Sequence, residues 1–336
     1  MRIPVTIITG FLGAGKTTLL RHLLAQAQGR RLALIINEFG EQGIDRDLLL
    51  GCGDATCEPG DIVELANGCL CCKVADDFLP TIEALLARPN RPDHIVVETS
   101  GLALPKPLVK ALAWPEVRVR LTVDGVIAVI DGPAVAAGRF ADDTAQGVTP
   151  PPDHDNPLAE VFEDQLACAD LVILNKRDAL ADEAAAAVRH ILAGHMRAGA
   201  RVVEASFGAV DPRIALGLQS GAEDDLATRP SHIDAVGDHD HDDFESFALD
   251  LPAIAEPDSF ARRLAATLIA HDVLRVKGFI DVPGKPRRLA LQAVGPRIEQ
   301  YFDRPWNADE RRASRLVVIG RTGLDRAAIT RALSAG

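Results

Sequence analysis

The sequence predicts an α/β fold: a doubly wound, mostly parallel sheet in a first domain, followed by a smaller α+β domain. Two observations support this prediction. Apolar runs rich in Val and Ile alternate with amphipathic helical patterns over about the first two hundred residues, as in a parallel sheet with helices on both faces. After residue 244, strand patterns follow one another with few helices between them, which is typical of an α+β arrangement.

The predicted first domain contains a series of buried strands. Each is apolar on both faces, as the strands of a covered parallel sheet must be. These strands are predicted at 5–9, 32–37, 94–99, 125–131, 170–175 and 200–206. The clearest helical patterns between them lie at 16–28 and 181–196. A proline-rich stretch at 147–157 predicts a surface loop.

The rest of the chain is predicted to form a linker and a second domain. Residues 208–243 lose the hydrophobic periodicity and are rich in Gly, Asp and His, which is typical of a linker. Beyond them, strands are predicted at 244–251, 273–282, 287–294 and 314–320, and helices at 257–271 and 325–336. The predicted domains are therefore 1–207 and 244–336, joined by 208–243.

Charge and composition exclude several classes of partner. The formal net charge of −12, concentrated between residues 223 and 245, argues against a nucleic-acid partner. No apolar run approaches the roughly 18 residues that would cross a bilayer, so we expect no membrane partner. The six cysteines are too few for a disulfide framework in a chain of 336 residues. A reducing cytosol would keep these cysteines as thiols, so we expect a cytoplasmic protein.

A phosphate-binding loop is predicted at residues 10–17, "GFLGAGKT", which fit G-x-x-x-x-G-K-[ST] between a strand and a helix. The Lys16 ammonium would reach the β- and γ-phosphates, and the Thr17 hydroxyl would bind Mg²⁺. Backbone amides would surround the phosphates with the positive end of the helix dipole behind them. The other residues expected to contact the phosphates are Gly10, Gly13, Ala14, Gly15 and Thr18. The alternative is a glycine-rich turn that binds nothing.

The segment "LVILNKRD" predicts recognition of guanine. Asp178 would accept hydrogen bonds from the guanine ring N–H and amino group, which adenine cannot match. Asn175 would supply an amide to the purine edge, and the Lys176 stem would pack on the base. A strand-end turn exposed to solvent is the alternative reading of this tetrapeptide. The preceding phosphate loop favours GTP.

A second acidic motif is predicted in "HIVVETSG". Glu98 ends a buried strand beside the expected γ-phosphate, where it would order the Mg²⁺ shell or a water molecule. A strand-end carboxylate that caps the next turn is the alternative. Gly101 would allow the backbone to contact the γ-phosphate and to respond to its loss.

Three cysteines in "NGCLCC" predict a transition-metal site. In an extended segment Cys69 and Cys71 face the same side, while Cys72 faces away unless the chain turns. Converging thiolates suit Zn²⁺, Cu⁺ or Co²⁺ far better than Mg²⁺. A redox relay is the alternative, although that chemistry more often uses C-x-x-C. The remaining Cys168 is predicted to be a small buried apolar group.

These segments together resemble the CobW family of P-loop GTPases that handle transition metals. The resemblance rests on "GFLGAGKTTLLRHLL", "IINEFGEQGID", "NGCLCC", "VVETSGLALPKPLV", "TVDGVIAVID" and "ILNKRD", which occur in the family's order. It implies a cytosolic GTP-hydrolysing metallochaperone with a CobW-type C-terminal domain at 244–336. "LALPKPL" and "TVDGVI" are most similar to the members that supply Co²⁺ for cobalamin synthesis, which implies a metal acceptor such as a cobaltochelatase. Relatives that serve Zn²⁺ share the same core motifs.

The order of the motifs predicts a switch. GTP and Mg²⁺ would pull Glu38 and its loop toward the nucleotide and bring "GCLCC" into its metal-binding shape, and hydrolysis would release the metal. Glu38 would serve either the metal or the nucleotide. The residue that positions the hydrolytic water is one of four candidates, Glu38, Glu41, Gln42 and Glu98.

Other residues leave the functional class open. Cys52 and Cys57 are either accessory thiols or plain loop residues, and His239 and His241 are either weak metal ligands or part of an acidic linker. Three alternative classes of protein share some of these motifs. They are a regulatory GTPase with structural cysteines, a P-loop kinase acting on a small molecule, and a GTP-independent zinc store.

Overall fold

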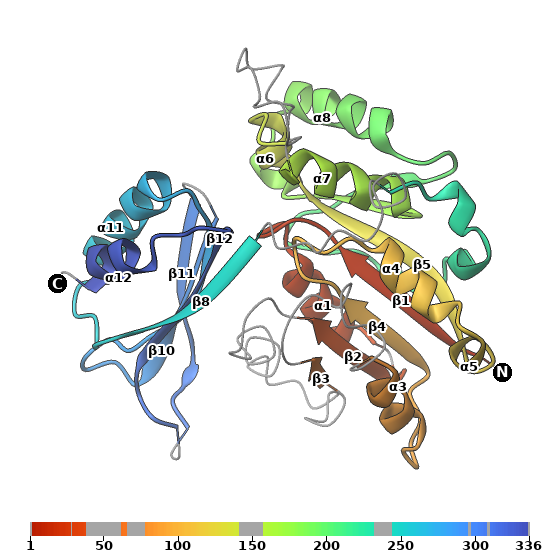
Figure 1. Cartoon of the computed structure of the whole chain (residues 1–336), viewed down its shortest axis with the longest axis horizontal. Helices are drawn as coiled ribbons and strands as arrows, with labels where there is room; N and C mark the ends of the chain where they lie inside the picture. The colour runs from red at the N-terminus through yellow and green to blue at the C-terminus, as the bar shows by residue number, and fades with distance from the viewer. Residues whose placement is uncertain are drawn as a thin grey trace. The chain divides into compact units, whose positions relative to one another are not determined.

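The structure is a computed structural model that describes residues 2–27, 29–37, 62–65, 78–140, 157–231, 244–294, 297–307 and 310–334. The chain divides into two compact units, and each is considered by itself. The described part of the first unit runs to residue 231, and that of the second begins at residue 244. Figure 1 shows the elements of both units.

The first unit is built on a parallel sheet. Its described part has seven strands in the order β3-β2-β4-β1-β5-β6-β7, and every neighbouring pair is parallel. The strands are β1 (Ile3–Thr9), β2 (Leu32–Asn37), β3 (Ile62–Leu65), β4 (His94–Glu98), β5 (Leu121–Asp131), β6 (Leu171–Asn175) and β7 (Arg201–Glu204). The predicted mostly parallel α/β fold is therefore confirmed. The short strand β3 was not predicted, because four residues carry too little periodicity.

Helices cover the sheet on both faces. They are α1 (Lys16–Ala25), α3 (Leu79–Leu86), α4 (Lys106–Leu112), α5 (Pro115–Arg118), α6 (Gly132–Ala136), α7 (Pro157–Cys168), α8 (Asp182–His195) and α9 (Pro212–Ala215). In Figure 1, α7 and α8 lie toward the β5–β7 end of the sheet, and α3 lies near its other end. One apolar cluster joins strand residues such as Ile7 and Val97 to Leu85 of α3 and Leu108 of α4. This core packs β1, β2, β4 and β5 against these helices.

Two parts of the first unit differ from the predictions. Strand β7 is exposed or half-buried rather than buried, because it is paired on one side only, to β6, in the described sheet. Residues 208–231, predicted as the start of the linker, pack on the first unit instead. Backbone N–H groups of Gly217, Leu218 and Gln219 donate to the Asp124 carboxylate at 2.7–3.2 Å. Polar contacts of this kind leave no hydrophobic period in a sequence.

Buried ion pairs also attach the 208–231 segment. The Arg229 side chain is fully buried and lies 2.7 Å from both Asp170 and Asp225. Short 3₁₀ turns, Ala222–Asp224 and Leu226–Thr228, carry the chain along the unit. The rest of the predicted linker, 232–243, and the predicted loop at 147–157 lie outside the described residues, apart from Pro157, which starts α7.

The second unit is an antiparallel sheet with two helices. The described strand order is β11-β10-β9-β12-β8, with every neighbouring pair antiparallel. Its elements are β8 (Phe244–Leu251), α11 (Pro257–Ala270), β9 (Val273–Ile280), β10 (Arg287–Val294), β11 (Arg297–Pro305), β12 (Ser314–Arg321) and α12 (Arg326–Ser334). Phe260 and Leu264 of α11 and Ile329 of α12 pack with apolar strand residues in one core.

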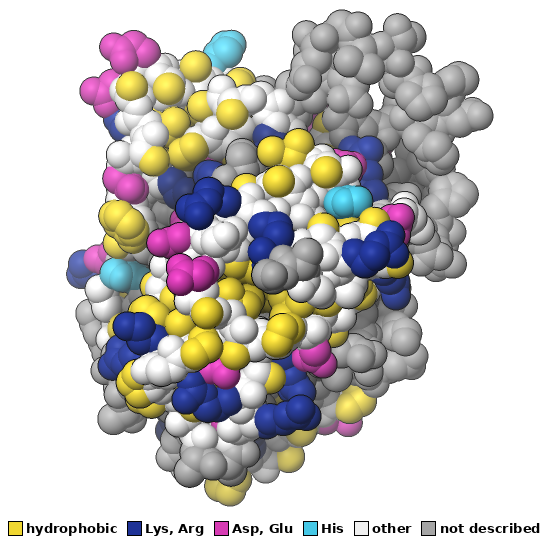
Figure 2. Space-filling model, turned by 90° about the vertical axis from the view of Figure 1, so that its left-hand side faces the viewer, with side chains coloured by type: hydrophobic (Ala, Val, Ile, Leu, Met, Phe, Trp, Pro, Cys, Tyr) yellow, Lys and Arg dark blue, Asp and Glu magenta, His cyan; other side chains and the backbone are white. Residues whose placement is uncertain are grey.

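The α+β prediction for this unit is confirmed, but β11 was not predicted. Its residues are mostly exposed or half-buried, so their sequence lacks an apolar stripe. Figure 2 views the side on which α11 and α12 lie and shows basic, acidic and hydrophobic side chains mixed over the visible face. None of the helices in the described ranges is both long and apolar enough to cross a membrane.

Candidate nucleotide site at the carboxyl edge of the sheet

The predicted phosphate loop connects β1 to α1. Gly15 has a φ of 105°, and a Cβ added there would lie 2.3 Å from Nδ2 of Asn175, so only glycine fits the backbone at this position. Lys16 is 5% exposed, and its Nζ donates to the Gly10 carbonyl at 2.7 Å across the loop. The loop is therefore closed on itself and packed against the end of β6.

The start of α1 suits an anion. Its first turn carries no acidic side chain, so the positive end of the helix dipole is not neutralised by its own residues. The predicted phosphate contacts Gly10, Gly13, Ala14, Gly15, Lys16, Thr17 and Thr18 lie in this one continuous loop and first turn. Thr17 is half-buried, and its hydroxyl is the group that would hold Mg²⁺.

The second acidic motif lies beside the phosphate loop. Glu98 ends β4, is 4% exposed, and pairs in register with Ile8 of β1. A Cβ added to Gly101 would lie 2.7 Å from the backbone nitrogen of Leu12. The loop after β4 and the phosphate loop are therefore so close that there is no room for a side chain between their backbones. Gln165 of α7 donates to the carbonyls of Gly101 and Ala103, at 3.3 Å each, and holds this second loop from the other side.

Asn175 ties the segment predicted to recognise the base to the phosphate loop. Its side chain is 2% exposed, and Nδ2 donates to the Ala14 carbonyl at 2.8 Å. Its Oδ1 accepts from the Gly208 backbone N–H at 3.0 Å. The amide therefore fastens three segments together: the phosphate loop, the end of β6 and the turn after β7. Sequence reasoning expected it at the purine edge and missed this positioning role.

Lys176 and Asp178 occupy the next turn. Lys176 has a φ of 59°, and its Nζ lies 3.1 Å from Oδ2 of Asp131. Asp131 is buried at the end of β5 and also accepts from the Ala134 N–H, which starts α6. Asp178 is exposed and makes no hydrogen bond or ion pair with any described residue. Its carboxylate can therefore accept hydrogen bonds from a bound base.

Sequence reasoning missed two residues that support this site, Asp131 and Gly208. Asp131 pairs in register with Asn175, so a carboxylate at the end of one strand meets the recognition segment at the end of the next. The pairing of Asp131 with Asn175 could have revealed this role, but it can be read only once β5 and β6 are known to be neighbours. Gly208 lies in the segment predicted to be linker, and no pattern there distinguished it.

The predicted metal site involves residues that lie outside the described ranges. These residues are the three cysteines of the motif and the accessory candidates: Cys69, Cys71, Cys72, Glu38, Glu41, Gln42, Cys52, Cys57, His239 and His241. The described ranges contain no group of three or more His, Cys, Asp or Glu side chains suited to a metal ion. Cys168 is described, and it is a free thiol that is 1% exposed. Burial raises its pKa to about 12, so it stays a neutral thiol, as its predicted packing role requires.

The loop geometry at the carboxyl edge of a parallel sheet defines a P-loop nucleotide-binding protein. Residues 4–204 match the family described as CobW/HypB/UreG, nucleotide-binding domain, and residues 244–336 match the cobalamin synthesis protein CobW C-terminal domain. The chain belongs to the CobW/HypB/UreG family, as the sequence resemblance predicted.

Curated relatives match nearly the whole chain. It is 53% identical to a zinc chaperone CobW from Sinorhizobium sp., over 99% of this chain and 97% of that protein. It is 53% identical to a zinc chaperone CobW from Pseudomonas aeruginosa, over 99% and 91%. It is 31% identical to the zinc chaperone YjiA of Escherichia coli, over 95% and 94%.

Proposed function

We propose that this protein is a GTP-hydrolysing metallochaperone that binds a transition metal through its cysteine motif and releases it to an acceptor protein. The observation that carries the nucleotide half of the proposal is the Asn175 amide, which fixes the base-recognition turn to the phosphate loop. A base held by Asp178 and a triphosphate held by the loop would thus be positioned by one rigid frame.

Hydrolysis would use the residues at the edge of the sheet. Lys16 would stabilise negative charge on the transferred phosphoryl group, and Glu98 would orient the attacking water or the shell of the metal ion held by Thr17. Bound Mg²⁺ would supply charge neutralisation for the phosphates. Glu38 is the other candidate for orienting the water, from the loop that follows β2.

The cargo is proposed to be Zn²⁺, bound by Cys69, Cys71 and Cys72. Thiolate ligands select Zn²⁺ over hard cations, and three curated relatives that each match nearly all of the chain are named zinc chaperones. Co²⁺ for cobalamin synthesis, with a cobaltochelatase as acceptor, is the second candidate. The description of the matched C-terminal domain as that of a cobalamin synthesis protein supports it.

Metal titrations in each nucleotide state test this function. With Mg²⁺ and a non-hydrolysable GTP analogue, Co²⁺ should give the intense absorption of tetrahedral thiolate ligation, and the C69S/C71S variant should lose it. Affinity should be weaker with GDP, because metal and nucleotide sites that are coupled affect each other reciprocally. Equal metal affinity in the apo, GDP and GTP-analogue states would contradict the carrier proposal.

Competition and acceptor assays separate the two cargoes. Zn²⁺ is expected to displace Co²⁺ in the titration, but intrinsic affinity follows the divalent series and does not identify the biological metal. The deciding measurement is GTP-dependent transfer from the loaded protein to a zinc-requiring or a cobalt-requiring acceptor. Transfer of cobalt alone would replace the zinc proposal, and transfer without GTP would contradict both.

A further inference from the structure

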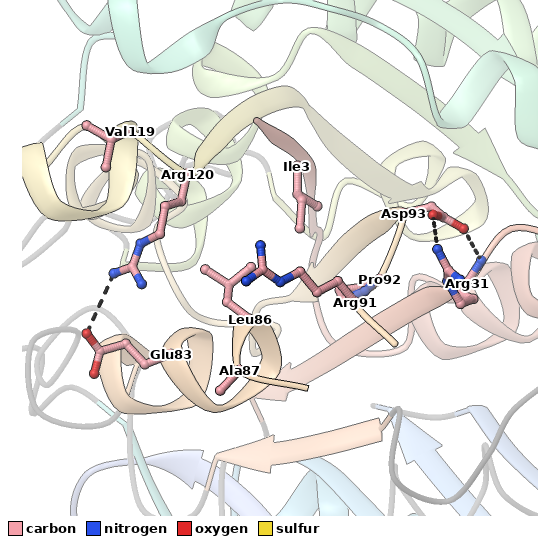
Figure 3. Close-up of a pocket in the computed structure, with 10 residues that line it drawn as sticks. All are labelled: Ile3, Arg31, Glu83, Leu86, Ala87, Arg91, Pro92, Asp93, Val119 and Arg120. Atoms are coloured by element: carbon pink, nitrogen blue, oxygen red, sulfur yellow. Dashed lines mark hydrogen bonds and ion pairs between the residues drawn. The ribbon is translucent and has the colours of Figure 1, made fainter. Parts of the chain in front are cut away.

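A hollow opens at the amino ends of the strands, at the edge of the sheet opposite the phosphate loop (Figure 3). Its volume is about 490 Å³, within the range of small-molecule sites. It lies where β1 begins, between the end of α3 and the start of β4, and directly before β5. Its apolar lining consists of Ile3, Leu86, Ala87, Pro92 and Val119. None of these residues belongs to the nucleotide site.

Three arginines line the hollow, and they differ in how firmly they are held. Arg31 is fixed to Asp93, with its Nη2 at 2.6 Å and its backbone N–H at 3.0 Å from the two carboxylate oxygens. Arg120 donates from its Nε to the Glu116 carbonyl at 3.3 Å, and its Nη2 lies 3.6 Å from Oε1 of Glu83, an ion pair beyond hydrogen-bond distance. Arg91 makes no hydrogen bond or ion pair with any residue in the described ranges. The Arg91 guanidinium is thus available for a ligand, and the Nη atoms of Arg120 make no hydrogen bond with a described residue.

The arginines that are available lie over an apolar floor. Figure 3 shows Arg91 extending across the hollow over Leu86, toward the side on which Arg120 lies. Leu86 is 6% exposed, so the floor is packed and rigid, whereas Val119 on the rim is 73% exposed. Planar guanidinium forks match carboxylate and phosphate oxygens, and the surface beneath them suits an apolar group.

Local charge favours an anion. The lining carries three arginines against Glu83 and Asp93, a net charge of +1 (3 − 2), in a chain with a formal charge of −12. Asp93 is already engaged by Arg31, and its pKa is lowered by the hydrogen bond from the Arg31 backbone and by the guanidinium. Glu83 likewise pairs with Arg120, so the positive charge that is not offset belongs to Arg91.

We propose that this hollow binds a small organic anion. A carboxylate or phosphate monoester group would lie between Arg91 and Arg120, and its apolar body would rest on Leu86 and Ala87. The proposal does not depend on the GTPase or metal function, because the hollow and the nucleotide site lie at opposite ends of the strands.

The test uses the full-length protein with GDP and Mg²⁺ saturating the phosphate loop, so that phosphate probes cannot enter there. Phenyl phosphate, benzoate and inorganic phosphate are titrated by calorimetry and by ligand-observed NMR. Phenyl phosphate should bind about fivefold or more tightly than inorganic phosphate, because its ring covers the apolar floor. Whether benzoate or phenyl phosphate binds more tightly shows which acidic group the arginines prefer.

Single-arginine variants test where the ligand binds. R91A and R120A should each weaken phenyl phosphate binding by about tenfold, the usual effect of losing a charge-assisted hydrogen bond. R88A removes the same charge from a neighbouring arginine that does not line the hollow, and it should leave binding unchanged. Equal weakening by R88A would indicate general electrostatic attraction and overturn the site. No binding of phenyl phosphate or benzoate, or equal affinity for inorganic and phenyl phosphate, would also overturn it.

Discussion

At the scale of single residues, Asp178 should set base specificity. It is exposed and without a partner among the described residues, so its role depends on the ligand alone. We expect D178N to weaken GTP binding at least about tenfold, because an amide replaces a charged acceptor facing two guanine donors. The same variant should favour xanthosine triphosphate, whose carbonyl accepts from the new N–H. Binding of both nucleotides is measured by competition with a fluorescent GDP analogue.

A matched control separates recognition from damage to the turn. Asp182 lies four residues after Asp178, and its exposed carboxylate pairs with Arg177. The D182N variant should leave base preference unchanged. Unchanged preference for guanine in D178N would remove Asp178 from the role. Weakened binding of every nucleotide, xanthosine triphosphate included, would instead point to a disturbed turn.

Residues around Asp178 show how far sequence reasoning reached at this scale. The motif predicted that Asn175, Lys176 and Asp178 belong together, because their spacing is fixed along one strand end. It could not predict that both ends of the Asn175 amide bond to backbone from distant segments, or that Asp131 holds Lys176. Those contacts depend on which strands are neighbours, and spacing along the chain does not encode sheet order.

At the scale of elements, a polar cluster lies inside the sheet at β1, β4 and β5. His94 is 4% exposed, with its Nε2 2.7 Å from Oγ1 of Thr6 and 4.0 Å from Oδ2 of Asp124. Burial lowers the pKa of His94 from 6.5 to about 4, although the Asp124 carboxylate acts in the opposite direction. The folded protein therefore holds this imidazole neutral at neutral pH.

This lowered pKa predicts acid-sensitive stability. Between pH 6.5 and about 4 the unfolded chain binds a proton at His94 that the folded chain does not, so stability is lost as the pH falls through this window. The loss should approach about 3 kcal/mol at its acid end. Urea unfolding of the wild type and of H94Q at pH 7.0 and pH 5.0 measures the part of this loss that occurs above pH 5.0, about 2 kcal/mol. H94Q should show a smaller fall, and an equal fall in both proteins would contradict the prediction.

The 208–231 segment is expected to contribute to the stability of the first unit. R229M removes a fully buried guanidinium and leaves Asp170 and Asp225 without that partner. We expect the free energy of unfolding, measured in urea, to fall by about 3 kcal/mol. The reason is that carboxylates which have lost their buried cationic partner destabilise the folded state. The control R189M breaks an exposed ion pair with Glu204 and should cost less than about 1 kcal/mol. Equal effects would mean that the segment is held only loosely.

Elements were predicted well where an apolar period marks them and poorly where polar contacts form them. Strands β1, β2, β4 and β6 are rich in Val, Ile and Leu and buried in the sheet, and their residues alone predict them. Strand β11 is largely exposed, and the 208–231 segment is attached by ion pairs and backbone hydrogen bonds. Neither leaves a periodic pattern, so both were missed.

At the scale of the whole molecule, the cores of the two units consist of separate sets of residues. The described apolar cluster around Ile7 and Val97 draws only on the first unit, and that around Phe260 and Leu264 only on the second. The phosphate loop, Glu98 and the base-recognition turn all lie in the first unit. Nucleotide binding should therefore depend on the first unit alone. The proposed transfer of metal to an acceptor is not tied to the first unit in this way.

This separation predicts that a chain of residues 1–231 folds and binds GTP without the second unit. Its affinity for GTP should stay within about 0.5 kcal/mol of the full-length value, because no described nucleotide contact is removed. Calorimetry gives the affinity, and circular dichroism during urea unfolding shows whether the shortened chain unfolds cooperatively.

A chain of residues 1–207, ended at the predicted domain boundary, is the matched comparison. It lacks Gly208, which bonds to Asn175, and Arg229, so it should be less stable and bind GTP more weakly. Equal behaviour of the two shortened chains would show that residues 208–231 do not support the site, and failure of both to fold would show that the first core is not self-sufficient.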